Sequence, residues 1–131
     1  MVAILINQVT MIELQIQKLL KSSSGEMTLD INLELEEHKL ITIYGKSGAG
    51  KSTLLMLLAG LMTPEKGYIK VGGEVWTDMD NKILLSPQKR NIGFVFQEYA
   101  LFPNMTVKEN LKFALGKGQS SNIVDQLIDI I

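Results

Sequence analysis

Apolar and polar residues alternate in two stretches near the start of the chain, with the period of two that is typical of a half-buried β-strand. The first stretch is Met11–Lys18 and the second is Leu29–Leu35. Lys21–Glu26, between them, holds three serines and a glycine, a composition typical of a turn. We therefore expect the two strands to pair as an antiparallel hairpin.

Two later runs are continuously apolar and rich in β-branched or aromatic residues, which indicates strands covered on both faces. These runs are Leu40–Tyr44 and Ile92–Phe96. A second hairpin is predicted over Gly67–Trp76, because Gly72-Gly73 separates two short strand-like segments.

Three segments have the spacing and start signals of helices. Ser52–Leu61 consists mostly of good helix formers, and Thr106–Leu115 opens with a threonine followed by Glu109, the pattern of a capping box. Ser121–Ile131 repeats the start signal and carries an apolar stripe at helical spacing. Because the chain stops on that stripe, we expect it to be the N-terminal part of a longer protein.

Composition limits the classes of function. The chain has 131 residues, enough for one small domain, and its 13 basic and 14 acidic residues nearly cancel, which argues against nucleic acid as the main partner. It has no cysteine and one histidine, so thiolate or multi-histidine metal sites are not expected. No run approaches the roughly 20 apolar residues of a membrane span, and the apolar opening Met1–Ile6 is too short for a signal peptide. A cytoplasmic location is therefore expected.

The strongest chemical signal is a phosphate-binding loop that matches G-x-x-x-x-G-K-[ST] without a mismatch. It lies between a predicted buried strand and a predicted helix, the context that such a loop needs. The loop is formed by Gly45, Lys46, Ser47, Gly48, Ala49, Gly50, Lys51 and Ser52.

Each position in this loop has a chemical reason. Gly45, Gly48 and Gly50 leave room for phosphate to approach the backbone N–H groups and permit positive φ. The helix that follows directs N–H groups and the positive end of its dipole at the anion. Lys51 is expected to reach the β and γ phosphates and Ser52 to coordinate Mg²⁺, while Thr53, the next residue, can reach the α phosphate.

A second landmark lies at the end of the apolar run that closes near Phe96. The segments GKSGAGKSTLL, LAGLMTPEKGYIKVGG and GFVFQEYALFPNMTVKENL follow one another in the order found in the ATP-binding subunits of ABC transporters. From Met11 onward the chain resembles these subunits. Among the subgroups, it is most similar to the molybdate importers, and sulfate, iron and polyamine importers share parts of the pattern.

The resemblance implies a fold, ligands and partners. The fold is an α/β P-loop NTPase core of three layers with an antiparallel β subdomain, here in truncated form. Gly45–Thr53 would bind ATP, and Gln97 would bind Mg²⁺ together with Ser52. The segment after Gln97, with Tyr99, Leu101 and Phe102, would contact a transmembrane permease subunit, although these side chains equally fit into their own core. A second ATP-binding subunit would close the site at the inner face of the membrane.

The resemblance also has gaps. Met1–Thr10 has no counterpart, so we expect residues 1–10 to be an extra segment and residues 11–131 a partial ATP-binding domain. The aromatic residue that contacts adenine in most relatives is missing from Lys21–Met27. The signature motif, the Walker B aspartate, the catalytic glutamate and the switch histidine would follow Ile131. No catalytic residue is therefore expected in this chain, and hydrolysis by it alone should be negligible.

Three readings remain open at this point. The chain can be part of the ATPase subunit of an importer, a non-catalytic nucleotide-binding module, or a truncated fragment with no role of its own. The segment around Gln97 favours an ABC-type ATPase over an unrelated P-loop kinase or GTPase.

Overall fold

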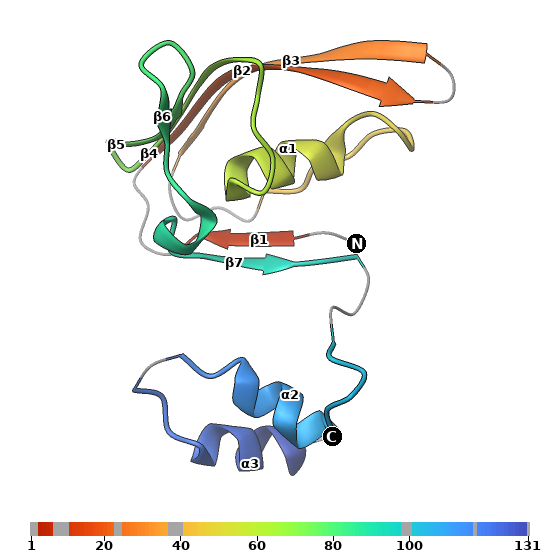
Figure 1. Cartoon of the computed structure of the whole chain (residues 1–131), viewed down its shortest axis with the longest axis vertical. Helices are drawn as coiled ribbons and strands as arrows, with labels where there is room; N and C mark the ends of the chain where they lie inside the picture. The colour runs from red at the N-terminus through yellow and green to blue at the C-terminus, as the bar shows by residue number, and fades with distance from the viewer. Residues whose placement is uncertain are drawn as a thin grey trace. The chain divides into compact units, whose positions relative to one another are not determined.

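The computed structural model describes residues 3–6, 11–22, 25–36, 41–97, 101–116 and 118–130, and divides into two units, Met1–Val95 and Phe96–Ile131. The elements are shown in Figure 1. Their order is β1 (Ala3–Ile6), β2 (Met11–Ser22), β3 (Gly25–Glu36), α1 (Lys51–Ala59), β4 (Lys66–Val71), β5 (Glu74–Asp78), β6 (Ile83–Leu84), a 3-10 turn (Pro87–Lys89), β7 (Ile92–Val95), α2 (Val107–Phe113) and α3 (Asn122–Ile128).

The first unit contains an antiparallel sheet with the strand order β3-β2-β4-β5-β6. The predicted hairpin is confirmed, because β2 pairs with β3 along its whole length. The predicted turn over Lys21–Glu26 is too long. Lys21 and Glu26 belong to the strands, where they face each other in register and form an ion pair of 3.3 Å. That cross-strand pair stabilises two extra rungs of the ladder in a segment whose composition resembles a turn.

The second predicted hairpin is also confirmed and joins the same sheet. Its strands β4 and β5 pair on either side of Gly72 and Gly73, whose φ values of 58° and 83° form the tight turn that suits a twisted hairpin. The other edge of β4 pairs with β2, so this hairpin extends the first one into a single surface.

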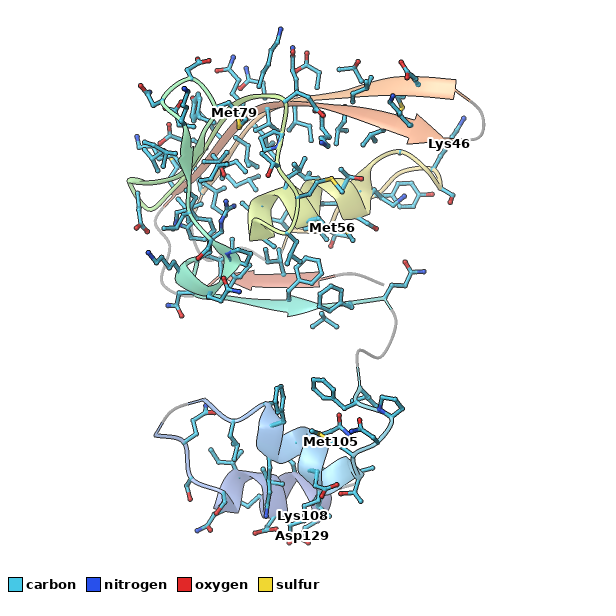
Figure 2. The ribbon with its side chains drawn as sticks, viewed as in Figure 1. Lys46, Met56, Met79, Met105, Lys108 and Asp129 are labelled. Carbon is cyan, nitrogen blue, oxygen red and sulfur yellow. The ribbon has the colours of Figure 1, made fainter. Side chains whose placement is uncertain are left out.

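Helix α1 packs against one face of this sheet, and side chains fill the space between them (Figure 2). The helix prediction is confirmed, with a start at Lys51 and a C-cap at Gly60, whose φ is 75°. The buried core combines the inward residues of three strands with the last turn of the helix. Its members are Leu14, Ile16, Leu57, Leu58, Ile69, Val71 and Trp76.

The two predicted buried strands behave differently from expectation. Residues 41–44 form no strand, and Ile41, Ile43 and Tyr44 are exposed by 45%, 38% and 98%. Leu40, which was included in that prediction, lies outside the described residues. A strand needs a ladder partner for its backbone groups, and none of the described strands pairs with residues 41–44.

The run that ends at Phe96 does form a strand, β7, but only half of its residues are shielded from solvent. β7 pairs with β1, an antiparallel strand that the sequence did not predict. In Figure 1 these two strands lie on the side of α1 opposite the large sheet. Ile4 and Ile6 of β1 pack against the core. The ladders found among the described strands are all antiparallel, so the predicted three-layer core remains a prediction.

The second unit contains the two predicted C-terminal helices. The capping box of α2 is confirmed, because the backbone N–H of Thr106 donates to Glu109 Oε2 at 2.7 Å and Glu109 N–H donates to Thr106 Oγ1 at 3.3 Å. Lys108 Nζ donates to Asp125 Oδ1 of α3 at 2.7 Å, and Val124 is buried. Both helices end before the predicted boundaries, at Phe113 and Ile128.

Candidate functional site

The predicted phosphate loop lies at the N-terminal end of α1, as its motif requires. Gly50 is the N-cap of the helix, with φ 85° and ψ 9°, and Gly48 has φ 80°. These positive φ values confirm the reason for glycine at both positions, because other residues rarely adopt them. The backbone N–H of Ala49 donates to the carbonyl oxygen of Lys46 at 3.2 Å and tightens the turn. Gly45 has no positive φ, so that part of its predicted role is wrong.

Lys51 folds back across the loop. Its Nζ donates to the carbonyl oxygen of Gly45 at 2.8 Å and to that of Lys46 at 2.6 Å. An ammonium group has three N–H donors, and these two bonds hold the charge inside the curve of the loop. The arrangement places a cation among backbone groups at the start of a helix.

The first turn of α1 is electrostatically suited to an anion. The N–H groups of Lys51, Ser52 and Thr53 have no carbonyl four residues earlier within the helix, as at every helix start. No side chain caps this end, and the first turn contains no acidic residue. The positive end of the helix dipole is thus not offset by a carboxylate of its own turn, which favours phosphate at this position.

The tip region of the first hairpin lies beside the loop. A Cβ added to Gly50 would lie 2.9 Å from Leu29 Cδ1 and 3.4 Å from Leu20 Cδ1. The sequence analysis did not predict this packing, although alternation places Leu29 on the inward face of its strand. Adenine contact by Lys21–Met27 remains a prediction, and residues 23–24 lie outside the described part of the chain.

The second predicted landmark begins in β7 of the first unit, and its residues from Phe96 onward fall in the second unit. Gln97 is exposed and lies at a bend just after β7, and its predicted contact with Mg²⁺ remains untested by this geometry. Tyr99 lies outside the described residues. Leu101 is 66% exposed, whereas the Phe102 ring contacts Phe113 edge-to-face with centroids 4.7 Å apart. Phe102 therefore packs partly within its own unit.

The donor chemistry fits a magnesium ion delivered with phosphate. Mg²⁺ prefers oxygen ligands and usually takes only one or two from the protein, with phosphate oxygens and water completing its shell. Ser52 offers a hydroxyl oxygen in the first turn of α1, beside the loop glycines. In the part of the chain that the structure describes, no group of three or more His, Cys, Asp or Glu residues could hold a metal ion.

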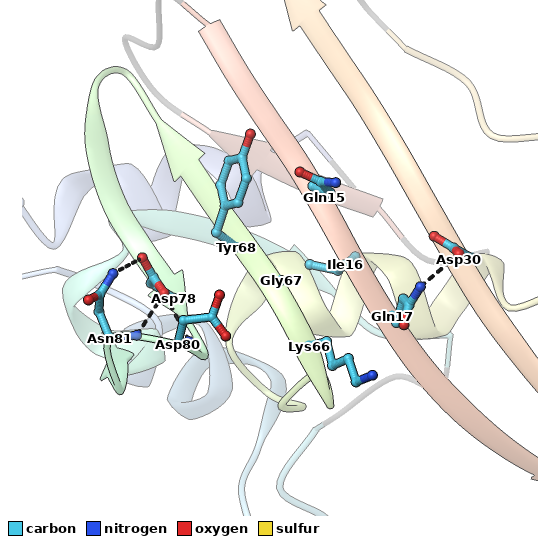
Figure 3. Close-up of a pocket in the computed structure, with 10 residues that line it drawn as sticks. All are labelled: Gln15, Ile16, Gln17, Asp30, Lys66, Gly67, Tyr68, Asp78, Asp80 and Asn81. Carbon is cyan, nitrogen blue, oxygen red and sulfur yellow. Dashed lines mark hydrogen bonds between the residues drawn. The ribbon is translucent and has the colours of Figure 1, made fainter.

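A hollow lies on the outward face of the five-stranded sheet (Figure 3). Two of its carboxylates already have partners, since Asp30 accepts from Gln17 at 2.9 Å and Asp78 accepts from the Asn81 side chain at 2.8 Å. The Asn81 bond is the main cause of the lowered pKa of Asp78. Polar residues such as Gln15 and Gln17 are ordinary on a solvated sheet face. The phosphate loop is therefore the better candidate.

The chain is similar in sequence to known proteins. Residues 28–130 match the family model described as ABC transporter. The molybdenum import ATP-binding protein of Haemophilus ducreyi is 40% identical over 107 residues, which cover 82% of this chain and 30% of that protein. The corresponding protein of Photobacterium profundum is 44% identical over 93 residues, covering 71% of this chain and 26% of the relative.

A relative with a different cargo in its name also matches. The sulfate/thiosulfate import ATP-binding protein of Synechocystis sp. is 49% identical over 86 residues, which cover 66% of this chain and 22% of that protein. The chain therefore spans less than a third of the length of these relatives. Among the described helices, none is long and apolar enough to cross a membrane.

Proposed function

Because this chain belongs to the ABC transporter family, we propose that it binds Mg-ATP as part of the ATPase subunit of an importer. The phosphates lie against the backbone of Gly45–Thr53 with Lys51 as their main positive charge. Ser52 and Gln97 supply oxygen ligands to Mg²⁺. Residues 11–131 form the partial ATP-binding domain, and residues 1–10 are an additional segment.

One observation carries this proposal: the Lys51 ammonium lies 2.8 Å and 2.6 Å from two loop carbonyl oxygens at the uncapped N-terminal end of α1. A triphosphate can replace those carbonyls as the partner of the ammonium without a large movement of the lysine. The glycines at 48 and 50 adopt the positive φ values that shape the loop. These features together favour a polyphosphate over a neutral ligand.

Two further parts of the proposal concern partners. The exposed Leu101 and the segment around it contact a permease subunit at the inner face of a membrane. A second ATP-binding subunit completes the nucleotide site, since the phosphates bound at one loop need groups on their open side. The family assignment and the names of the relatives support both parts.

The proposed cargo is molybdate or a similar oxyanion. Support comes from the names of the relatives, several of which are molybdenum import proteins, while one is a sulfate/thiosulfate import protein. To test the cargo, residues 11–131 replace the matching segment of a molybdate-importer ATPase and, separately, of a sulfate-importer ATPase, because this chain alone is not expected to hydrolyse ATP. Restored growth at low molybdate supports the proposal, and restored sulfate uptake alone would contradict the choice of molybdate.

The nucleotide proposal is tested by substituting Lys51 with alanine and measuring Mg-ATP affinity by calorimetric titration. Loss of a charged hydrogen-bond donor to phosphate is worth about 1.5–3 kcal/mol, so we expect affinity to fall roughly ten- to hundredfold. Lys66→Ala is the matched control, because Lys66 lies on the outward face of the sheet (Figure 3) and should leave the affinity unchanged. Equal affinity of the Lys51→Ala variant and the unsubstituted chain would contradict the loop assignment.

A further inference from the structure

Arg90 is a buried cation whose role the phosphate loop does not explain. Arg90 is 2% exposed, and no carboxylate among the described residues forms an ion pair with its guanidinium. Burial lowers the pKa of the guanidinium. A charge removed from water without a counter-ion is costly unless its hydrogen bonds are complete. The surrounding groups must therefore supply that compensation.

The first part of the compensation comes from the end of the phosphate-loop helix. Nη1 of Arg90 donates to the carbonyl oxygens of Leu57 and Leu58, at 3.1 Å and 2.8 Å. Both carbonyls belong to the last turn of α1, where the helix dipole places partial negative charge. The guanidinium thus binds the C-terminal end of the same helix whose N-terminal end forms the candidate site.

The second part comes from strand β5 and from Leu85, the residue that follows β6. Nε donates to the carbonyl oxygen of Leu85 at 2.9 Å, and Nη2 donates to the Trp76 carbonyl oxygen at 3.3 Å and to Thr77 Oγ1 at 2.8 Å. The guanidinium carbon also lies 5.6 Å from the centroid of the Trp76 ring, within the range of a cation–π contact. These bonds and those to α1 engage all three guanidinium nitrogens.

The backbone around the guanidinium is closely fitted to it. A Cβ added to Gly60, the C-cap of α1, would lie 2.6 Å from Arg90 Cζ and 2.6 Å from Nε. Arg90 also ends the 3-10 turn and stands two residues before β7, which begins at Ile92. One side chain therefore fixes the helix end, strand β5 and the entry to β7 against one another.

We propose that Arg90 is a positioning residue for the phosphate loop, setting the position of α1 along its axis by binding the carbonyls of its last turn. The inference rests on the proposed nucleotide function of Gly45–Thr53. Helix α1 has nine residues and a rise of about 1.5 Å per residue, so it is a short, stiff rod. A displacement at its C-terminal end is carried to Lys51 and Ser52 at the other end.

The planar fork of arginine is essential to this role. A lysine at position 90 keeps the positive charge near the helix end but has a single nitrogen, which cannot reach α1 and the strands at once. Arg90→Lys therefore tests the hydrogen-bonding geometry of the guanidinium while the positive charge is kept. Thr77→Val removes one acceptor of Nη2 and leaves the two bonds to α1 in place. It is therefore a second, milder variant that perturbs the same guanidinium.

The test compares these variants by two measurements in the full chain. The first is the set of backbone amide chemical shifts of Gly45–Thr53 without nucleotide, and the second is calorimetric Mg-ATP affinity, both under conditions where circular dichroism shows folded protein. Val71→Ala is the matched control, because it destabilises the buried core from β4 without touching Arg90. We expect Arg90→Lys to shift the loop amides and weaken Mg-ATP binding about tenfold. Thr77→Val should have a smaller effect in the same direction.

A purely structural role for Arg90 predicts a different pattern. In that case folded Arg90→Lys has the loop amide shifts and the Mg-ATP affinity of the Val71→Ala control, and the proposal is overturned. If Arg90→Lys is too unstable to study, unchanged loop amides in Thr77→Val overturn the proposal as well. Failure of the unsubstituted chain to bind Mg-ATP contradicts the nucleotide function itself, whereas the amide shifts still report whether Arg90 positions the loop.

Discussion

At the scale of single residues, close backbone approach fixes the identity of Gly67. This residue has φ 94°, and a Cβ added to it would overlap the backbone carbonyl oxygen of Gln15 on the neighbouring strand. Gly73 also has a positive φ, of 83°, but an added Cβ would meet no atom within 4 Å. The two glycines therefore differ in steric surroundings while sharing an unusual backbone conformation.

Alanine substitutions at these two positions should differ sharply in their effect on stability. Gly73→Ala carries only the cost of a left-handed conformation, about 1–2 kcal/mol. Gly67→Ala adds a clash with a backbone that cannot move without breaking the β2–β4 ladder, so we expect a loss of roughly 3 kcal/mol or more. Urea unfolding followed by tryptophan fluorescence measures both. Similar losses for the two variants would contradict the close approach seen between β4 and β2.

At the scale of elements, local signals predicted more than long-range ones. Both hairpins and all three helices were predicted because turn residues, capping residues and periodicity are contained in each segment. Leu40–Tyr44 and Ile92–Phe96 were predicted as buried strands from their apolar and β-branched composition. Burial of a strand depends on which partner pairs with it, and the sequence of the strand does not contain that information. The contacts of Arg90 with α1 were likewise not predictable, because they join residues more than 30 positions apart.

The site shows the same division. Motif spacing predicted the phosphate loop, its glycines at 48 and 50 and the helix that follows, since all of these lie in one continuous segment, Gly45–Ala59. The packing of Leu20 and Leu29 against Gly50 was not predicted, because it depends on how the hairpin sits over the loop.

The capping box of α2 gives a pH prediction. Backbone and hydroxyl hydrogen bonds from Thr106 hold the pKa of Glu109 below its ordinary value of 4.5. Because the pKa is lower in the folded state, the ionised carboxylate contributes its full stabilisation at pH values above the ordinary pKa. That contribution is lost as the pH falls through the folded-state pKa. We therefore expect α2 to lose stability on acidification. The part of this dependence due to Glu109 is removed in Glu109→Gln, whereas the part due to Asp125, whose pKa is lowered by the hydrogen bond from Lys108, is retained.

The measurement is helicity and amide exchange of α2 between neutral pH and about pH 3. At neutral pH the Glu109→Gln variant should be the less stable of the two, and the two curves should converge in acid. Glu26→Gln is a suitable control, because its carboxylate lies in the first hairpin and not in α2. An unchanged acid dependence in Glu109→Gln would show that protonation of another group causes the loss of stability of α2 in acid.

At the scale of the whole molecule, the N-terminal segment is part of the first unit and not an appendage to it. Strand β1 forms four rungs with β7, from Ala3 opposite Val95 to Ile6 opposite Ile92. Ile4 and Ile6 are half-buried against the core. Strand β1 thus covers one edge of the strand that leads toward Gln97.

Deletion of residues 1–10 should therefore weaken the first unit. Two half-buried isoleucines contribute roughly 2–3 kcal/mol by burial of apolar surface, and the edge of β7 loses its ladder partner. We expect a lower urea midpoint and faster hydrogen exchange at the amides of β7. Ile130→Ala, at a residue that is 80% exposed in the second unit, serves as a control without effect on either quantity. Unchanged exchange at β7 after the deletion would contradict the β1–β7 pairing.

The central claim is that Gly45–Thr53 forms a site for Mg-ATP, and residue-resolved titration tests it most directly. Backbone amide spectra of the full chain are recorded with increasing Mg-ATP. The account predicts saturable shifts centred on Gly48, Gly50 and the first turn of α1, which in Lys51→Ala require roughly ten- to hundredfold more Mg-ATP. Shifts confined to the outward hollow around Tyr68 and Asp78, or no saturable shift at all, would contradict it.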